Sequence, residues 1–304
     1  HYDRCGIDAE VSAEQLNGIY RSKYRLKEQP LVSVIIPNKD HTEDLDKCIR
    51  SIEEKGTYKN IEYIVIENNS QKKETFAYYE KLQAENPKVK VVFWEREFNY
   101  SAINNYGVGF AKGEYLLFLN NDTEIINPDC IEELLGYCMR DDVGIVGARL
   151  YYEDDTIQHV GVIIGLGGVA GHTFVGEPKD SLGYFGRIVT AQDYSAVTAA
   201  CLMTKRKVFE KVNGFEEKLA VAFNDVDFCL KVREAGYLVV YNPYAELHHY
   251  ESKSRGLEDT EEKVLRFQGE IRTFQYRWKE ILNEGDPYYS PNLTLDKTDF
   301  SLRI

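Results

Sequence analysis

Two amides and a carboxylate at the end of an apolar run are the first residues in this sequence with the chemistry of a binding site. The run at 116–119 ends in Asn120, Asn121 and Asp122. Consecutive apolar residues bounded by polar ones are typical of a strand buried on both faces, and ligands bind beyond the carboxyl ends of such strands. Asp122 is therefore placed to bind a hard divalent cation. A plain strand-ending turn, which Asn and Asp also favour, is the alternative.

A second acidic cluster lies at 222–236, where Asn224 can cap a helix whose first turn holds Asp225 and Asp227. Carboxylates favour this end of a helix for its dipole alone. Because residues two apart on a helix point in different directions, one carboxylate can face a cleft while the other anchors the loop. A carboxylate in a cleft can deprotonate a hydroxyl, so this cluster is a candidate for general-base chemistry.

A third cluster combines histidines with cations. His248 and His249 follow a strand predicted at 237–241, and the polar loop after them contains Lys253 and Arg255. Vicinal histidines point apart, so normally only one of them reaches a given ion, and a structural histidine is the alternative. The loop either closes on phosphates or is simply solvated.

The elements that must position these clusters follow from the alternation of apolar and helical patterns. Strands alternating with helices over the first 150 residues predict a doubly wound, mostly parallel α/β sheet. The Gly-rich stretch at 157–176 predicts a smaller antiparallel part. The predicted strands are 31–36, 61–66, 89–93, 115–119, 196–204 and 237–241, and the predicted helices are 42–56, 71–85, 100–112 and one each from Asn127 and Asn224.

The two ends of the chain have patterns of their own. Leu16, Ile19 and Tyr20 have helical spacing and predict a leading helix before a linker that ends at Pro30. An apolar stripe at 258–283 predicts a helix that either docks onto the domain or associates with a second copy of the chain. We therefore expect a leading helix and linker at 1–30, one domain at 31–256 and a C-terminal helical extension at 257–304.

Composition narrows the partners and the compartment. The 304 residues have a net charge of −13 with scattered Lys and Arg, which argues against nucleic acid and anionic lipid as partners. The six cysteines have no metal-site spacing, which favours a reduced, cytoplasmic chain. No apolar run reaches the roughly 18 residues that a membrane span needs. Because the first residue is His1 and not Met, we expect a piece of a longer, multi-domain chain.

Seven short motifs occur in the order found in one enzyme family. They are VSVIIPNKD at 32–40, IVIENNS at 64–70, NYSAINNYG at 99–107, LFLNNDT at 117–123, NGF at 213–215, NDVDFCLKVREAGY at 224–237 and HHYESKSRG at 248–256. In these motifs, over about residues 30–256, the chain resembles the inverting family 2 glycosyltransferases of GT-A fold. The resemblance implies transfer of a sugar from a nucleotide-sugar donor to a hydroxyl, with a UDP-sugar favoured and dTDP-rhamnose as the alternative.

The resemblance also implies where the enzyme works. The variants of the third and seventh motifs are most similar to bacterial members that build surface polysaccharides or glycans on surface proteins. It therefore implies a glycan or glycoprotein acceptor. We expect a cytoplasmic protein, with the inner face of the membrane as the alternative location.

Roles for single residues follow from the same resemblance. It implies that Asp225 is the catalytic base and that Mn²⁺ or Mg²⁺ binds at Asp122, with His249 completing the site and His248 as the alternative. A nitrogen ligand favours Mn²⁺, since Mg²⁺ prefers oxygen shells. Asn120 replaces the first Asp of the Asp-x-Asp motif, so we expect weak, exchangeable metal binding. The implied nucleotide contacts are Pro37, Asn38, Asp40, Glu67, Asn104, Asn121, Lys253 and Arg255.

Two of these positions depart from the family pattern. Glu67 stands where the family usually has the Asp that reads the base, and Asn104 stands where many members have an Arg near the pyrophosphate.

Two other classes of protein stay open. A nucleotidyltransferase would need the metal but no base at Asp225. A non-catalytic nucleotide-sugar-binding or assembly module would bind a nucleotide without turnover.

Overall fold

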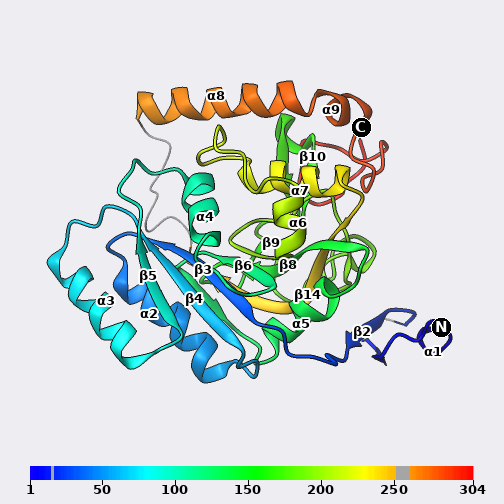
Figure 1. Cartoon of the computed structure of the whole chain (residues 1–304). Helices are drawn as coiled ribbons and strands as arrows, with labels where there is room; N and C mark the ends of the chain where they lie inside the picture. The colour runs from blue at the N-terminus through cyan, green and yellow to red at the C-terminus, as the bar shows by residue number, and fades with distance from the viewer. Residues whose placement is uncertain (15–16, 251–259, 304) are drawn as a thin grey trace.

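A sheet of ten strands forms the centre of the protein, whose computed structural model describes residues 1–14, 17–250 and 260–303 (Figure 1). The strands are β3 (Val32–Asn38), β4 (Ile61–Glu67), β5 (Val89–Phe93), β6 (Tyr115–Leu119), β7 (Thr123–Ile125), β8 (Val143–Tyr151), β9 (Ile157–His159), β12 (Gln192–Asp193), β13 (Cys201–Lys205) and β14 (Leu238–His249). Their order is β12-β14-β8-β13-β6-β3-β4-β5, with β7 paired to β14 and β9 to β8.

The sheet is parallel where the sequence predicts it. Strands β5, β4, β3 and β6 run parallel to one another, as do β8 and β14, whereas β13 lies antiparallel between β6 and β8. The prediction of a doubly wound, mostly parallel α/β sheet is therefore confirmed. Because the carboxyl ends of parallel strands meet at one edge, Asn38, Glu67 and the residues after Leu119 come together there.

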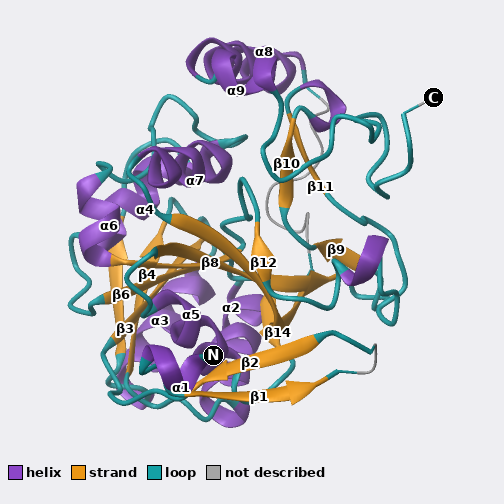
Figure 2. Ribbon diagram, turned by 90° about the vertical axis from the view of Figure 1, so that its right-hand side faces the viewer, coloured by secondary structure: helices purple, strands orange, loops and turns teal. Residues whose placement is uncertain are grey.

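Helices cover both faces of this sheet (Figure 2). Side chains of successive strand residues enter opposite cores, with Ile35 and Ile64 in one and Val34 and Val65 in the other, because a strand alternates its side chains. One face packs against α2 (Thr42–Arg50, continued by a π-helical turn over 51–55), α3 (Lys73–Glu85) and α5 (Cys130–Cys138); the other packs against α4 (Tyr100–Val108), α6 (Arg206–Lys211) and α7 (Asn224–Glu234).

Strand β8 is missing from the sequence prediction, although it lies in the middle of the sheet and all of its residues are buried. Gly144 and Gly147 interrupt its apolar pattern. A Cβ at Gly147 would stand 2.5 Å from that of Val197, so only glycine lets that segment pass this close to the strand. The interruption is thus a packing requirement and not the end of a strand.

Strand β14 is longer than predicted. It continues through Pro243 with a register shift between Asn242 and Glu246, and it then pairs with β7 on one side and β8 on the other. His248 and His249 consequently lie on the strand itself, and the prediction that the strand ends at 241 before them is wrong. Successive strand side chains point to opposite faces, which separates the two rings.

The predicted leading helix around Leu16–Tyr20 is also wrong. A four-residue helix α1 (Tyr2–Cys5) is followed by an antiparallel hairpin of β1 (Ala9–Ala13) and β2 (Tyr20–Tyr24). Gly18, between the two strands, has φ +89°, a conformation that glycine adopts at no steric cost. Along β2 tyrosines and serine alternate with cations, which is strand periodicity.

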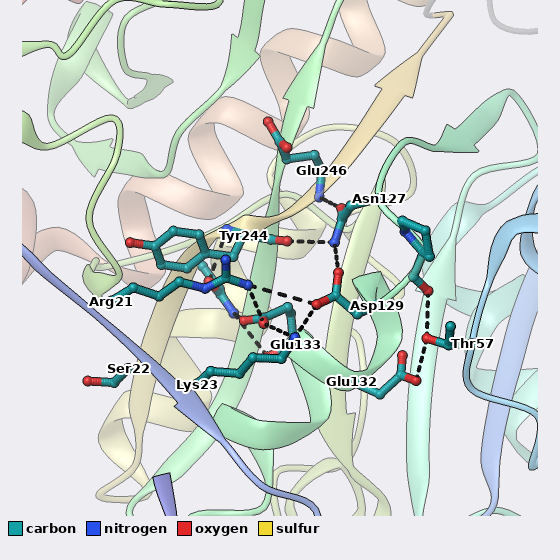
Figure 3. A network of polar contacts seen from close by, with 12 residues as sticks. Arg21, Ser22, Lys23, Thr57, Asn127, Asp129, Glu132, Glu133, Tyr244 and Glu246 are labelled. Carbon is teal, nitrogen blue, oxygen red and sulfur yellow. Dashed lines mark hydrogen bonds and ion pairs between the residues drawn. The ribbon is translucent and has the colours of Figure 1, made fainter. Parts of the chain in front are cut away.

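Charged and polar bonds dock this hairpin on the main domain (Figure 3). Arg21 donates to Glu133 of α5 at 2.7 Å and lies over the ring of Tyr244 at 4.2 Å, while Lys23 bonds Asp129. Glu133 is only 3% exposed, so these cations compensate a buried charge. Asn127 then joins Asp129 to the backbone of Tyr244 in β14.

Short antiparallel pieces and C-terminal helices complete the fold. The hairpin of β10 (Val162–Ile164) and β11 (Ala170–His172) confirms the antiparallel prediction for the Gly-rich stretch. The C-terminal extension forms α8 (Glu261–Arg277) and α9 (Lys279–Glu284), broken at Trp278. None of the helices in the described ranges is long and apolar enough to cross a membrane.

The apolar stripe of α8 docks onto the domain. Phe274 is fully buried and Trp278 is 7% exposed, and Phe223 of the domain packs against Phe267 and Phe274. In Figure 1 the helix lies across the molecule beside α7 and β10. Association with a second copy through this helix stays a prediction.

Candidate active site

Asp122 and His249 lie side by side at the edge of the sheet where the parallel strands end. The two side chains are 7% and 9% exposed, and Asp122 Oδ1 stands 3.2 Å from His249 Nε2. Two ligand atoms bound to one ion at about 2.1 Å each lie roughly this far apart. The carbonyl of Asp122 also accepts from the Tyr250 amide at 2.9 Å, which ties the turn to the end of β14.

The tautomer of His249 follows from Gln158 in β9. Gln158 Nε2 donates to the His249 carbonyl at 3.2 Å, so its Oε1, 2.6 Å from His249 Nδ1, must be the acceptor of a ring N–H. In the neutral ring Nε2 then presents a lone pair toward Asp122 and Asn120. The amide of Asn120, 3.1 Å away, can donate to that nitrogen. A carboxylate and a ring nitrogen that face each other in this way form a candidate site for a cation.

His248 turns to the other side of the strand. Its Nε2 lies 2.9 Å from Asp155, and its ring stacks against Tyr250. Of the two histidines, therefore, His249 accompanies Asp122. Within the described ranges no group of three or more His, Cys, Asp or Glu side chains is arranged to hold a metal ion.

Asp225 stands at the start of α7 and is half-buried. Its Oδ2 accepts from the amide of Ala199 at 3.1 Å, and its Oδ1 accepts from the amide of Val226. Each carboxylate oxygen has a second lone pair, which leaves acceptor capacity for a substrate hydroxyl. Asp227, in contrast, is fully buried and bonds Trp278 and Arg277, so it anchors the C-terminal helix.

Tyr100 of α4 connects the two acidic positions. Its hydroxyl donates to the carbonyl of Ala199 at 3.0 Å and stands 3.5 Å from Asn120 Oδ1. Burial raises the pKa of this hydroxyl, and the nearby carboxylates of Asp225 and Asp122 raise it further. Tyr100 is thus a neutral donor that lies between the candidate base and the candidate cation site.

On the other side of Asp122, three polar side chains at the strand ends and Tyr79 of α3 bond one another. Asn121 donates to Asn38 at 2.6 Å, Asn38 donates to Tyr79 at 2.8 Å, and Tyr79 donates to Glu67 at 2.7 Å. Glu67 also accepts from the amide and the hydroxyl of Ser70. All five residues are at least nine-tenths buried. The network holds the side chains at this edge of the sheet in place. The Glu67 carboxylate makes its hydrogen bonds within the protein.

Asp40 caps a helix. Residue 40 has φ +58°, and its carboxylate accepts from the amides of Gln71 and Lys72 and from the hydroxyl of Thr75, all at 3.0 Å. Partial burial alone would raise the pKa of Asp40, but these hydrogen bonds at the start of α3 lower it. The side chain therefore ties the segment after β3 to the start of α3.

The other residues expected at the nucleotide lie as follows. Pro37 is half-buried on β3, opposite Ile66. Asn104 is fully buried in α4, where it donates to the carbonyl of Tyr100 at 2.8 Å. Lys253 and Arg255 lie outside the described residues.

A cavity of about 470 Å³ lies between α8 and the β10–β11 hairpin. Phe223, two residues before Asp225, forms part of its wall together with Phe267 and Ile271 of α8, and His172 and Lys297 add polar groups. The cavity is therefore bounded by the β10–β11 hairpin, the turn before the candidate base and the C-terminal helix.

Sequence reasoning missed Gln158 and Tyr100. Gln158 lies in a three-residue strand within a Gly-rich stretch, and nothing in that stretch marks one glutamine as a partner for a histidine 91 residues away. The place of Tyr100 at the start of a helix could be predicted, because it directly follows the capping residue Asn99. The partners of its hydroxyl, Ala199 and Asn120, could not be predicted, because both are distant in sequence.

The fold and this edge of the sheet define the class of protein, a glycosyltransferase of GT-A fold. A solved mannosyltransferase, PcManGT from Pyrobaculum calidifontis in complex with GDP-Man and Mn²⁺, superposes with a TM-score of 0.59 over 84% of this chain and 69% of that one, at 16% identity. At that identity the likeness concerns the fold.

The sequence profile of Glycosyl transferase family 2 matches residues 33–212, and the chain belongs to that family. A protein called y4gI of Sinorhizobium fredii is 47% identical over 93% of this chain, and the O-antigen biosynthesis protein RfbC of Myxococcus xanthus is 37% identical over 100% of it. The chain spans 31% of the length of the first relative and 23% of the second.

Proposed function

We propose that this glycosyltransferase moves a sugar from a nucleotide-sugar donor to a hydroxyl of a glycan or glycosylated protein, with inversion of configuration at the anomeric carbon. The observation that carries the proposal is the chain of contacts from Asp225 through Tyr100 to the Asp122–His249 pair. A base on one side of a small space and a site for positive charge on the other are what a single displacement needs.

In this mechanism Asp225 takes the proton of the acceptor hydroxyl as that oxygen attacks the anomeric carbon. The bond from that carbon to the leaving nucleoside diphosphate breaks on the opposite face, so the configuration inverts. Ala199 orients the Asp225 carboxylate through its amide, and the same residue's carbonyl holds the Tyr100 hydroxyl. A base held from two elements keeps its geometry through the reaction.

A Mn²⁺ or Mg²⁺ ion held by Asp122 and His249 would neutralise the charge that develops on the leaving diphosphate. Gln158 fixes the ring so that Nε2 is the available ligand atom. With two protein ligands, the ion would bind weakly and would exchange readily. The nitrogen ligand favours Mn²⁺ over Mg²⁺.

The donor would lie on the strand-end network, with the remaining positions in supporting roles. We assign contact with the nucleotide to Pro37, Asn38 and Asn121, and an indirect role to Glu67, whose carboxylate holds Tyr79 and Ser70. Asp40 would support that edge through α3. Asn104 would act through Tyr100, and Lys253 and Arg255 are the cations proposed for the phosphates. A UDP-sugar is the favoured donor and dTDP-rhamnose the alternative.

The acceptor would enter through the cavity beside Phe223. Its walls are mostly apolar with a few polar groups, which suits the faces and hydroxyls of a sugar ring. The name of the Myxococcus relative, an O-antigen biosynthesis protein, supports a bacterial surface glycan as the product. Such a product would be assembled in the cytoplasm or at the inner face of the membrane.

A titration with UDP, GDP and dTDP, each with and without Mn²⁺, tests the donor half of the proposal. We expect one nucleotide to bind, more tightly with Mn²⁺, and Asp122→Ala to remove the effect of the metal. Equal binding with and without Mn²⁺ for every nucleotide would contradict the metal assignment. Asp225→Asn distinguishes the rival classes, because a nucleotidyltransferase keeps its activity in that variant and a non-catalytic binder has none to lose.

A further inference from the structure

Glu270 is a buried carboxylate that the mechanism above does not use. It lies on α8, outside the profile match at 33–212, and is 3% exposed. Its Oε1 accepts from the amide of Val221 at 2.7 Å, and its Oε2 accepts from the amide of Ala222 at 3.3 Å. Arg266, one turn earlier on α8, stands 3.6 Å from Oε2. A carboxylate from the C-terminal extension thus holds two successive amides of the turn that leads into α7.

That turn determines where Asp225 points. Phe223 has φ +60° and ψ 7°, a left-handed conformation that L residues with large side chains rarely adopt. Such a conformation persists where the surroundings over-determine it. Here the ring of Phe223 packs against Phe267 and Phe274, with centroids 5.8 and 5.4 Å away. Both rings belong to α8, so the helix holds the turn by side chain as well as by backbone.

The start of α7 is fixed to the same helix a second time. Asp227 accepts from the indole N–H of Trp278 at 2.9 Å and pairs with Arg277 at 3.2 Å. The residues on both sides of Asp225 are therefore attached to α8, while Asp225 itself contacts the catalytic edge through Ala199. Movement of α8 would move the base relative to Tyr100 and Asp122.

We propose that Glu270 is a positioning residue for glycosyl transfer, acting on Asp225 through the amides of Val221 and Ala222. The C-terminal helix is then part of the active site, in addition to its role as a packed extension. This inference rests on the proposed role of Asp225 as general base. It predicts that loss of Glu270 impairs the chemical step without impairing the donor site, which lies on other elements.

The test compares Glu270→Ala, Glu270→Gln and a control, Glu262→Gln, whose side chain is exposed on the same helix. The reaction followed is release of nucleoside diphosphate with water as acceptor, using the fastest of UDP-glucose, UDP-galactose, UDP-N-acetylglucosamine and dTDP-rhamnose. The stoichiometry and affinity of UDP or dTDP binding with Mn²⁺ are measured on the same samples. They report how much of each variant is folded with an intact donor site.

We expect Glu270→Ala to lower kcat about 100-fold, the loss that a misplaced catalytic group causes, with donor KM and nucleotide Kd within twofold of the unmutated protein. Glu270→Gln keeps one oxygen acceptor, so its kcat should be at least about a tenth of the unmutated value. Glu262→Gln should match the unmutated protein.

Two results would overturn the inference. One is a kcat for Glu270→Ala within threefold of the unmutated value at full binding stoichiometry. The other is a loss of kcat equal to the loss of nucleotide-binding sites, which would give Glu270 a folding role alone. Asp225→Asn separates the two proposals: if it keeps full activity, the base assignment fails, and if it loses activity while Glu270→Ala does not, only the positioning role fails.

Discussion

The two halves of the candidate site are held in different ways. On the donor side, Asn38, Glu67 and Asn121 come from the ends of neighbouring parallel strands and bond one another directly or through Tyr79. On the acceptor side, Asp225 begins a helix whose preceding turn is held by a helix from the end of the chain. The proposed donor side is built into the sheet, whereas the position of the proposed base depends on contacts between segments far apart in sequence.

This difference has a mechanical consequence. Strand ends in a hydrogen-bonded sheet cannot move independently, so the donor side is preorganised by the same bonds that make the fold. Two hydrogen bonds from backbone amides to Glu270 and aromatic packing on α8 fix the turn before Asp225. We therefore expect donor binding and the chemical step to respond separately to mutation.

The largest effect is expected at Asp225. Asp225→Asn keeps the size of the side chain and an oxygen that can accept from Ala199, but it removes the proton acceptor. We expect kcat to fall about 10²- to 10⁴-fold, the range for loss of a general base, with nucleotide binding unchanged. Steady-state kinetics and calorimetric titration of the same variant test both parts. Parallel losses of kcat and nucleotide affinity would mean that the two halves are not separable.

The next largest effect concerns the two histidines. His249→Ala should weaken Mn²⁺ binding more than about 100-fold, beyond the usual cost of losing an outer-shell partner. His248→Ala is the matched control, because that ring bonds Asp155 on the other side of the strand. The signal of free Mn²⁺ in electron paramagnetic resonance measures both variants. If His248→Ala were the weaker binder, the assignment of the metal to His249 would be wrong.

A smaller loss is expected when only the orientation of His249 is disturbed. Gln158→Leu removes the acceptor that fixes the ring tautomer, and such outer-shell changes cost about 10- to 100-fold in metal affinity. Gln275→Leu, at an exposed position on α8, is the control. The same resonance titration measures both, and unchanged affinity in Gln158→Leu would remove Gln158 from the site.

The smallest effect is on stability, and it depends on pH. Glu124 of β7 accepts from Lys47, Lys55 and Tyr250 at 2.8, 2.6 and 2.9 Å. Partial burial alone would raise the pKa of Glu124, but these bonds lower it to about 2. Because the pKa is lower in the folded state than the unperturbed 4.5, the stabilisation is complete above that value and is lost as the pH falls toward 2.

Glu124→Gln should therefore lower the free energy of unfolding by about 1 kcal/mol or less at pH 7, after allowance for solvent screening, and by less at pH 3. Urea unfolding at the two pH values measures the difference. Glu54→Gln, on an exposed side chain nearby, is the control. A Glu124→Gln effect that is the same at both pH values would contradict the charge-based explanation.

Much of the donor half could be predicted from sequence. Each parallel strand is a run of apolar residues that ends in a polar one, and strands of this type place their ends at one edge. Asn120, Asn121 and Asp122 could be recognised in this way, whereas Asn38 and Glu67 were expected only from the resemblance to the family. The helices between the strands have clear periodicity. The prediction failed where the pattern was interrupted for packing, as at Gly147 in β8. It also failed at the N-terminus, where the spacing of Leu16, Ile19 and Tyr20 predicted a helix but a strand begins at Tyr20.

The acceptor half could be predicted only in part. Asp225 was identifiable from its motif, because the residues of the motif are adjacent in sequence. Nothing in the sequence connects Glu270 with Val221, or Gln158 with His249, since each pair meets only after distant segments pack together. The choice between His248 and His249 also required the structure, because it depends on which face of β14 looks toward Asp122.

The sequence by itself determined the family, the α/β sheet and the residues at the strand ends. These depend on local periodicity and on short motifs, which are properties of neighbouring residues. The tertiary structure alone decided the tautomer of His249, the link from Tyr100 to both carboxylates and the attachment of the base to α8. Those features are hydrogen bonds and packing contacts between segments far apart in the chain, and their geometry exists only once the chain has folded.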